Sequence, residues 1–441
     1  MFLYVSVSII SFSCMILSSM KERLDKMEIY RCFLLSCTSL YDYYKEVMRV
    51  IQYIGVLLFF FLVSCEKNDV EPQKTRTLMV YLAGDNNLSG HMQKNITSMM
   101  SAWKESYHAN IVIYFDGPNA MPELYTFQFK GKEVEKRLLK KYEEMDSADP
   151  EVLKKVLNEM QDLYPSDSYG LILGSHASGW IPSGGFVRSN QMLYAEPVLT
   201  RSFGTDYTGS NQMDTRDMAK AIPFNKEKLE FILFDACLMS SIEVLYDLRE
   251  KAKYVIASPA ELPAPGFPYA RVMPYFWGKG TDLENDLVKV CNEFWDYYNT
   301  YNASNRFGTI ALIKMDGMKH LFNLTREVLQ GQKENVTAIN QNDVYCYPMV
   351  EYAKHDRFFD LGDYMKYMTK NRKGLYKEYR DFLDDEVVIY KKATNPFYYT
   401  EIPDETFSGI TTYIPLRIWP TAEKEAYWNF PWAGVYEAAT E

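Results

Sequence analysis

The stretch KLEFILFDA (228–236) is a short apolar run that ends directly before Cys237, and the stretch YGLILGS (169–175) ends in the same way before His176. Short runs that are rich in β-branched and aromatic residues favour strands buried on both faces. The same pattern recurs in three further runs, which are TLMVYLA (77–83), NIVIYFD (110–116) and AKYVIAS (252–258). The sequence therefore predicts five buried strands, two of which lead directly into a residue capable of catalysis.

Longer amphipathic stretches alternate with these strands. They cover residues 87–105, 149–163, 215–223 and 238–250. This alternation predicts an α/β fold in which a mostly parallel sheet is flanked by helices on both sides. Functional residues of such sheets gather at the carboxyl ends of the strands. We therefore expect His176 and Cys237 to lie near each other.

The end of the chain has a different pattern and predicts a smaller C-terminal α+β subdomain, residues 330–441, after a main domain of residues 77–329. Helical segments are expected near 358–387, followed by strands in NPFYY (395–399) and FSGITTYIP (407–415). Large aromatic side chains dominate burial, so we expect the aromatic residues here to pack in the core, with a sugar-binding platform as the alternative. They are Phe397, Tyr398, Tyr399, Tyr413, Trp419, Trp428 and Trp432.

The N-terminal part predicts export. Met48 and Arg49 open a positive region, residues 53–63 form an apolar run, and LVSC (62–65) resembles the bacterial lipobox, in which the cysteine is acylated. The apolar run is too short to span a bilayer as a helix; a buried strand or short core helix is the alternative interpretation. We expect a misassigned start or non-native leader (1–47), a signal peptide (48–64), and a polar tether (65–76) that begins at a lipidated Cys65 on the bacterial cell envelope.

Charge and cysteine content exclude several classes of function. The formal net charge is -10, from 58 acidic and 48 basic residues, so nucleic acid is not an expected partner. Of the seven cysteines, only three fall in the predicted folded part: Cys237, Cys291 and Cys346. Three thiols form no disulfide framework and show no zinc-ligand spacing, so at least one thiol stays unpaired within the chain. An unpaired thiol in an exported protein indicates deep burial or a chemical role.

Cys237 has the better context for a chemical role. It ends a predicted strand, and LMSSIEVLYDLRE (238–250) predicts a helix directly after it, whose free N-terminal amides would stabilise a thiolate. A histidine within reach would take the thiol proton and return it to the leaving group. His176 follows a strand, whereas the other histidines lie in polar or charged segments or before a strand; they are His91, His108, His320 and His355. Structural roles for both residues are the alternative.

Five motifs resemble, in the same order, those of the clostripain-like cysteine peptidases of the caspase-like clan. They are YLAGDNNL (81–88), GSHASGW (174–180), FDACLMS (234–240), ASPAELPAPGFPY (257–269) and SGITTYIP (408–415). The resemblance implies a caspase-like fold and an endopeptidase that hydrolyses peptide bonds through a thioester acyl-enzyme. By the same resemblance, Cys237 is the nucleophile, His176 is the base, and the backbone amides of Cys237 and Ala177 form an oxyanion hole, although the family usually has glycine at position 177.

The resemblance also bears on specificity. Family members that cleave after arginine or lysine resemble one another in an acidic residue before a Gly-Trp pair, where this chain has Pro265 before Gly266-Phe267. Proline cannot pair with a cationic side chain. Asp235 matches an acidic position that lines the family's substrate cleft, and with Glu261 it leaves two carboxylates for substrate binding.

Two further properties follow from the resemblance. The family is activated by cleavage between its His and Cys motifs, which here points to segment 180–213 with Arg188 and Arg201 as cleavage positions; an unprocessed surface loop is the alternative. Some relatives need calcium, and acidic residues such as Asp85 are candidates to bind it, although no EF-hand loop is present and no metal site is predicted. The competing function is a non-catalytic envelope lipoprotein that binds peptide or glycan on a peptidase-like fold.

Overall fold

The computed structural model describes residues 45, 76–182, 203–204, 206, 212–223, 228–300, 306–347, 357–397 and 400–440. The chain separates into two units after Pro72, and all the elements below belong to the second unit. Outside the described residues lie nearly all of the predicted leader, signal peptide and tether, together with Cys65, Arg188, Arg201 and His355. The predictions that concern them stay predictions.

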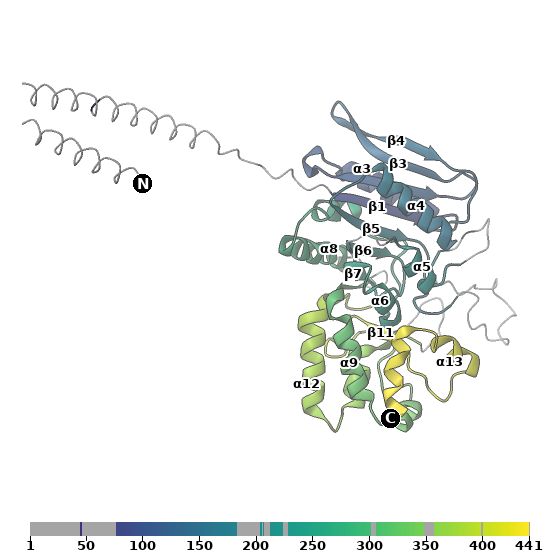
Figure 1. Ribbon diagram of the computed structural model, residues 1–441, viewed down its shortest axis with the longest axis vertical. Coiled ribbons are helices and arrows are strands. Elements are labelled where there is room, and N and C mark those ends of the chain that lie inside the picture. Colours follow the sequence, from purple (N-terminus) through teal and green to yellow (C-terminus); the bar gives the residue numbers. More distant parts are fainter. Residues whose placement is uncertain are drawn as a thin grey trace, which may run out of the picture. The chain divides into compact units, whose positions relative to one another are not determined.

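A nine-stranded sheet forms the centre of the fold, in the order β10-β8-β7-β6-β5-β1-β2-β3-β4 (Figure 1). Its five middle strands pair in parallel, as the five apolar runs predicted. In chain order these strands are β1 (Arg76–Ala83), β2 (Asn110–Asp116), β5 (Ser168–Gly174), β6 (Leu229–Asp235) and β7 (Ala252–Ala257). The predicted α/β architecture with a mostly parallel central sheet is confirmed.

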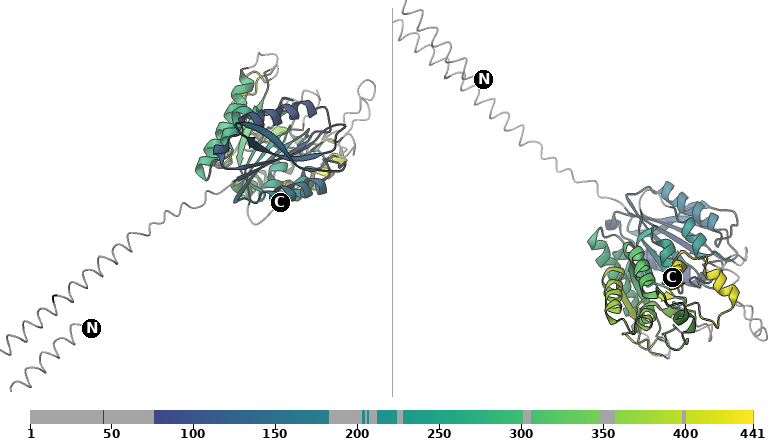
Figure 2. Two further views of the ribbon diagram at one scale, coloured as in Figure 1. Left: turned by 90° about the horizontal axis from the view of Figure 1, so that it is seen from above. Right: turned by 60° about the horizontal axis from the view of Figure 1, so that its bottom comes forward.

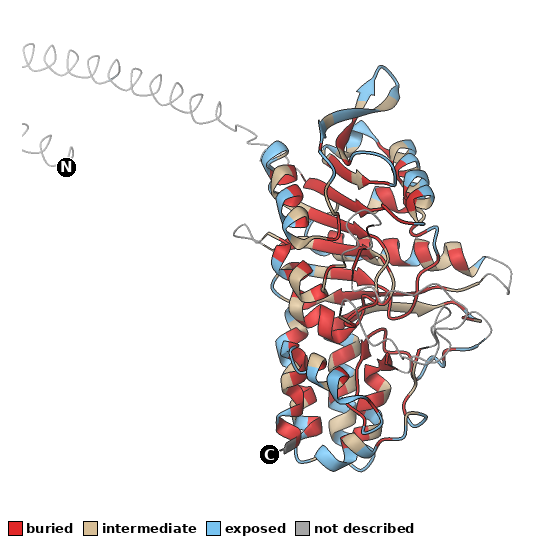
Figure 3. Ribbon diagram, turned by 90° about the vertical axis from the view of Figure 1, so that its right-hand side faces the viewer, coloured by how far each residue is buried: buried red, intermediate tan, exposed pale blue. Residues whose placement is uncertain are grey.

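Antiparallel strands extend the sheet at both edges, and the sequence did not predict them. One edge is formed by the hairpin of β3 (Glu123–Lys130) and β4 (Glu133–Lys141), and the other by β8 (Thr309–Lys314) and β10 (Val388–Ala393). The sequence of β4, EVEKRLLKK, is rich in charges because the strand is largely exposed, so it lacks the apolar run of a buried strand. Figure 3 shows the exposed surface of this hairpin beside the buried middle strands.

Helices cover both faces of the sheet, as predicted (Figure 2). Alternate side chains of β1 enter two separate hydrophobic cores, because successive residues of a strand point to opposite faces. The first core includes α4 (Pro150–Leu163), α5 (Thr215–Ala221), α6 (Ile242–Leu248) and α9 (Met318–Leu329). The second includes α3 (Ser89–Ala102), α7 (Tyr269–Val272) and α8 (Thr281–Asn299). In the described part of the chain, no helix combines the length and hydrophobicity needed to cross a membrane.

The C-terminal part packs against the first core and also supplies β10 to the sheet. Its further elements are α10 (Lys333–Ala338), β9 (Phe359–Asp360), α11 (Leu361–Met368), α12 (Lys373–Phe382), β11 (Thr411–Thr412) and α13 (Thr421–Tyr427). Short 3-10 or π turns complete the fold at Glu105–Tyr107, Met273–Tyr275, Met315–Gly317, Leu383–Val387, Pro431–Tyr436 and Ala438–Thr440.

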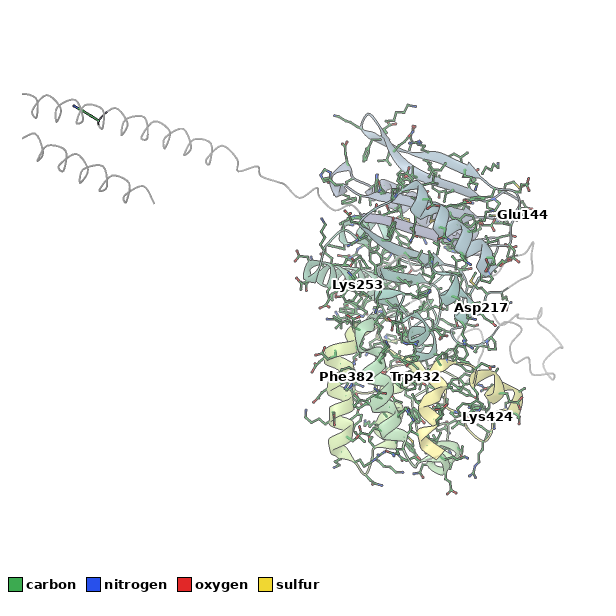
Figure 4. All side chains as sticks on the ribbon, viewed as in Figure 1. Glu144, Asp217, Lys253, Phe382, Lys424 and Trp432 are labelled. Carbon is green, nitrogen blue, oxygen red and sulfur yellow. The ribbon has the colours of Figure 1, made fainter. Side chains whose placement is uncertain are left out.

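The strand predicted in NPFYY is wrong for its described residues. The backbone of Phe397 pairs with Thr400, so the chain bonds to itself in a local turn and does not join a sheet. The expected core role of the aromatic residues is confirmed for four of them, since Phe397, Tyr413, Trp419 and Trp432 are buried, whereas Trp428 is 48% exposed. Trp432, labelled in Figure 4, contacts the rings of Tyr246 in α6 and Phe322 in α9.

Candidate active site

The register of the two central strands brings the predicted dyad to one level of the sheet. Gly174, the last residue of β5, is the Cα partner of Asp235, the last residue of β6. His176 and Cys237 each lie two residues beyond this pair. Because the strands are parallel, both residues leave the sheet at the carboxyl ends of neighbouring strands, where active sites of α/β sheets form.

The sulfur of Cys237 lies at the junction of the two cores and is half-buried. The backbone N–H of Leu262, in the loop after β7, donates a hydrogen bond to Sγ at 3.3 Å. The same sulfur lies 3.9 Å from the Leu262 carbonyl oxygen. A donor on the sulfur favours the thiolate over the thiol, and a half-exposed thiolate can attack a substrate. By contrast, Cys291 is fully buried, and burial raises the pKa of its thiol.

The helix predicted over 238–250 is present as α6, but its expected start directly after Cys237 is wrong. The chain first turns through Leu238, whose φ of 63° is left-handed, and α6 begins only at Ile242. The Leu238 amide donates to the carbonyl of Ala260 in the loop after β7, so the turn bonds to that loop and does not enter a helix. The sulfur is therefore stabilised by the Leu262 amide rather than by helix N-terminal amides.

His176 is half-buried and held from two sides. Its Nε2 lies 2.5 Å from Oδ1 of Asn87, in the loop after β1. An amide oxygen only accepts, so this contact favours the tautomer with the proton on Nε2. The His176 carbonyl accepts a hydrogen bond from the Gly204 amide at 2.9 Å, and Phe203 pairs with Ala177.

Sequence reasoning missed Asn87 as a functional residue. Its only signal was the pair of asparagines that follows β1 within YLAGDNNL. The preceding Asn86 fixes this turn, since its side chain donates to the Ala83 carbonyl and accepts from the Leu88 amide. The turn thereby presents Asn87 toward the imidazole of His176.

Asp235 lies beside the loop that follows β7. Its carboxylate accepts a hydrogen bond from the Tyr269 hydroxyl at 2.9 Å. Gly266, with φ of 71°, lies so close that a β-carbon there would be 2.5 Å from both carboxylate oxygens. Burial raises the pKa of Asp235 to about 6, although the bonds from Tyr269 and the Phe267 amide oppose the shift.

The other predicted substrate-binding residue, Glu261, is in the same loop and is 8% exposed. It directly precedes Leu262, whose amide contacts the sulfur, and Pro265 directly precedes Gly266. One segment, residues 260–269, therefore contains Glu261 and Pro265 and contacts both Cys237 and Asp235. The backbone-amide oxyanion hole at Cys237 and Ala177 stays a prediction.

The described residues offer no ready metal site. No three or more histidine, cysteine, aspartate or glutamate side chains come together among them in a group that could hold a metal ion. Asp85 is buried, but it is not part of such a group. Calcium dependence stays a prediction.

The fold and site together define an α/β protein with a cysteine and an oriented histidine at adjacent strand ends, the arrangement of a cysteine hydrolase. The chain belongs to the Clostripain family, whose sequence model matches residues 80–422. The predicted family membership is thereby confirmed. Clostripain from Hathewaya histolytica is 28% identical over 270 residues, which cover 51% of this chain and 47% of that protein. The chain thus matches about half the length of this curated relative.

Two solved relatives share the fold over nearly their whole length. An inactive zymogen C11 protease from Parabacteroides distasonis is 29% identical, with a TM-score of 0.66 and coverage of 83% of this chain and 99% of that chain. A secreted C11 cysteine protease from Bacteroides thetaiotaomicron, in complex with an irreversible peptide inhibitor, is 27% identical, with a TM-score of 0.68 and coverage of 83% and 100%. The fold of this chain is that of the C11 cysteine proteases.

Proposed function

We propose that this chain is a cysteine endopeptidase in which Cys237 is the nucleophile and His176 the general acid and base. The observation that carries the proposal is the common position of the two residues, each two residues beyond the Gly174–Asp235 pair. The Leu262 amide on the sulfur and Asn87 on the imidazole supply the stabilisation and orientation that the pair needs. The family and its C11 protease structures support the same activity.

The proposed reaction proceeds through a thioester. The His176 imidazole takes the thiol proton, and the thiolate attacks the carbonyl carbon of the peptide bond. The amides of Cys237 and Ala177 stabilise the oxyanion of the tetrahedral intermediate. Collapse of the intermediate breaks the C–N bond, and the imidazolium gives its proton to the departing amine. Water, deprotonated by the same imidazole, then hydrolyses the thioester and frees the sulfur.

We propose a preference for arginine or lysine before the scissile bond, carried by Asp235 and Glu261. The support is that the loop of residues 260–269 contains or contacts both acids and also contacts the sulfur. Pro265 stands where the resemblance to basic-specific family members implies an acidic residue, so this chain lacks that charge. The preference should therefore depend on the ionisation of Asp235.

Self-processing in segment 180–213, at Arg188 or Arg201, belongs to the same proposal. Its support is that Phe203 pairs with both Ala177 and Met213, so a cut before residue 203 would leave the new chain end held beside the site. Anchoring by lipid at Cys65, with a place on the cell envelope, rests on the LVSC motif, and a solved relative is described as secreted. Protein and peptide substrates are the expected partners.

Labelling with a thiol-reactive peptide probe tests the dyad. We expect the probe to label the wild type at Cys237, and Cys237→Ala and His176→Ala to lose this labelling. Cys346→Ala is the matched control, because Cys346 is also a half-buried cysteine. Equal labelling of the wild type and the His176→Ala variant would refute the peptidase proposal. The alternative function is a non-catalytic envelope lipoprotein that binds peptide or glycan, and its sugar-binding platform loses support because four of the seven aromatic residues that would form it are buried.

A further inference from the structure

We call residues 237–241, which lead from Cys237 to the start of α6, the nucleophile turn. A buried carboxylate lies between this turn and the C-terminal part of the chain. Glu243, in the first turn of α6, is 0% exposed. One of its oxygens accepts hydrogen bonds from the Tyr413 amide at 2.9 Å, the Thr412 hydroxyl at 3.2 Å and the Tyr427 hydroxyl at 3.2 Å. The other oxygen accepts from the Ser241 hydroxyl at 2.6 Å. A buried carboxylate needs several donors, and here they come from segments about 170 residues apart.

Two of the three C-terminal donors, Thr412 and Tyr413, belong to a segment that also bonds directly to the nucleophile turn. We call residues 408–413 the buttress segment. The Ser240 hydroxyl donates to the Gly409 carbonyl at 2.6 Å, and the Thr411 amide donates to the Ser240 carbonyl at 2.9 Å. On its other side, the segment is held by Asp360, which accepts from the Ser408 amide at 2.8 Å.

The turn itself requires support from outside. Leu238, the residue after the nucleophile, has a left-handed backbone with φ of 63°. This conformation costs a residue with a β-carbon about 1 kcal/mol, so it persists only where neighbouring structure imposes it. The loop after β7 holds one side of the turn. The Ala260 carbonyl accepts a hydrogen bond from the Leu238 amide, and the Ser258 carbonyl accepts one from the Ser240 amide. The buttress segment and Glu243 hold the other side.

We propose that Glu243 is a positioning residue for catalysis: it fastens the buttress segment to the end of the nucleophile turn and thereby fixes the position of Cys237. The proposal rests on the proposed role of Cys237 as the nucleophile. Glu243 does not touch substrate and acts through Ser241 and the strand β11. It also gives the SGITTYIP motif, far from the dyad in sequence, a physical part in the reaction.

Alanine and glutamine substitutions at position 243 test this role. In Glu243→Gln, the amide oxygen keeps the bonds from Tyr413, Thr412 and Tyr427, while the NH₂ group donates to the Ser241 oxygen. Glu243→Ala loses all four bonds. We expect Glu243→Ala to lower kcat more than about tenfold per folded molecule with KM changed less than about threefold, because a misplaced nucleophile affects the chemical step. Glu243→Gln should restore kcat to within about threefold of the wild type.

A pair of tyrosine variants separates positioning from general stability. Tyr427→Phe removes one donor from Glu243, whereas Tyr379→Phe removes a hydroxyl that lies 3.2 Å from the Thr325 hydroxyl, between α12 and α9. Both tyrosines are 0% exposed. Hydrogen exchange should accelerate in residues 238–243 for Tyr427→Phe and for Glu243→Ala, but not for Tyr379→Phe. A merely structural role of Glu243 would lower the melting temperature without this local change.

The outcomes are distinct. Wild-type kcat per folded molecule in Glu243→Ala, or unchanged exchange in residues 238–243, overturns the proposal. If Glu243→Ala does not fold, Tyr427→Phe and Ser241→Ala decide the question by the same two measurements. Full activity of Cys237→Ala refutes the proposed function instead, and the exchange measurement still reports whether Glu243 holds the turn.

Discussion

Gly174 and Asp235 are Cα partners in the parallel pair of β5 and β6, and each is followed two residues later by one member of the proposed dyad. Because the two strands end at this pair, the chain segments that carry His176 and Cys237 begin side by side at one edge of the sheet. What distinguishes the two residues is their supporting loop: the loop after β1 orients His176, and the loop after β7 contacts Cys237. The predictions below address these supports.

Substitution of Asn87 should change the pH dependence of catalysis. Asn87→Ala removes the acceptor on Nε2 of His176, and we expect kcat/KM to fall by about 10- to 100-fold because the imidazole loses its orientation. Asn87→Asp places a negative charge beside the ring, which raises the pKa of His176 and moves the acidic limb of the kcat/KM profile to higher pH. Profiles of kcat/KM from pH 5 to 9 measure both effects. An unshifted acidic limb in Asn87→Asp would contradict the proposed contact.

The preference for basic residues should depend on pH through Asp235. Burial raises the pKa of Asp235 to about 6, so the side chain is neutral below that pH and anionic above it. The ratio of kcat/KM for a lysine substrate to that for a norleucine substrate should therefore rise as pH increases through 6 in the wild type. In Asp235→Asn the ratio should be lower and independent of pH. Glu261→Gln, in the loop after β7, is the matched variant. If the ratio loses its pH dependence in Glu261→Gln but keeps it in Asp235→Asn, the pH dependence belongs to Glu261.

Replacement of Asp116 should stabilise the protein at neutral and alkaline pH. Asp116, at the end of β2, is 0% exposed, and burial raises its pKa to about 8, with Asp206, Glu144 and Asp85 adding to the shift. The unfolded chain ionises Asp116 near pH 4, so between about pH 4 and 8 this residue's contribution to stability falls by about 1.4 kcal/mol per pH unit. Asparagine does not titrate, so residue 116 in Asp116→Asn should not lower the free energy of unfolding as the pH rises.

Melting temperatures of the wild type and Asp116→Asn test that expectation. The difference between the two should grow in favour of the variant from pH 5 to pH 8 and then level off. Asp162→Asn is the control, because Asp162 is exposed on α4. A constant difference across this pH range would show that Asp116 is ionised in the folded protein.

Local patterns were sufficient for the centre of the fold and for the two residues of the proposed dyad. The middle strands are buried on both faces, so their sequences are continuous apolar runs. Both residues of the proposed dyad lie two positions after the end of such a strand. Edge strands such as β4 carry no such run. The left-handed turn at Leu238 has no signal either, since nothing in FDACLMS requires a positive φ at a leucine.

Contacts between distant segments could not be read from the sequence. Asn87 reaches His176 from 89 residues away, and Glu243 bonds to Tyr413 from 170 residues away. An asparagine after a strand and a glutamate in a helix have many ordinary roles. Only the packing of the folded chain brings Asn87 to His176 and Glu243 to Tyr413. The sequence alone therefore supports a dyad, but not the residues that hold it in place.

Substitution of Gly204 tests whether the chain that follows the proposed cleavage positions, Arg188 and Arg201, holds His176. Gly204 has φ of 80°, its amide donates to the His176 carbonyl, and a β-carbon there would lie 3.0 Å from Cβ of Ala148. We expect Gly204→Ala to lower both the melting temperature and kcat/KM per folded molecule. Gly131→Ala is the matched control: φ is 66° but no atom lies within 4 Å of the new β-carbon, so it should cost about 1 kcal/mol of stability and leave kcat/KM unchanged. Equal kcat/KM in the two variants would show that Gly204 does not help to hold His176 in place.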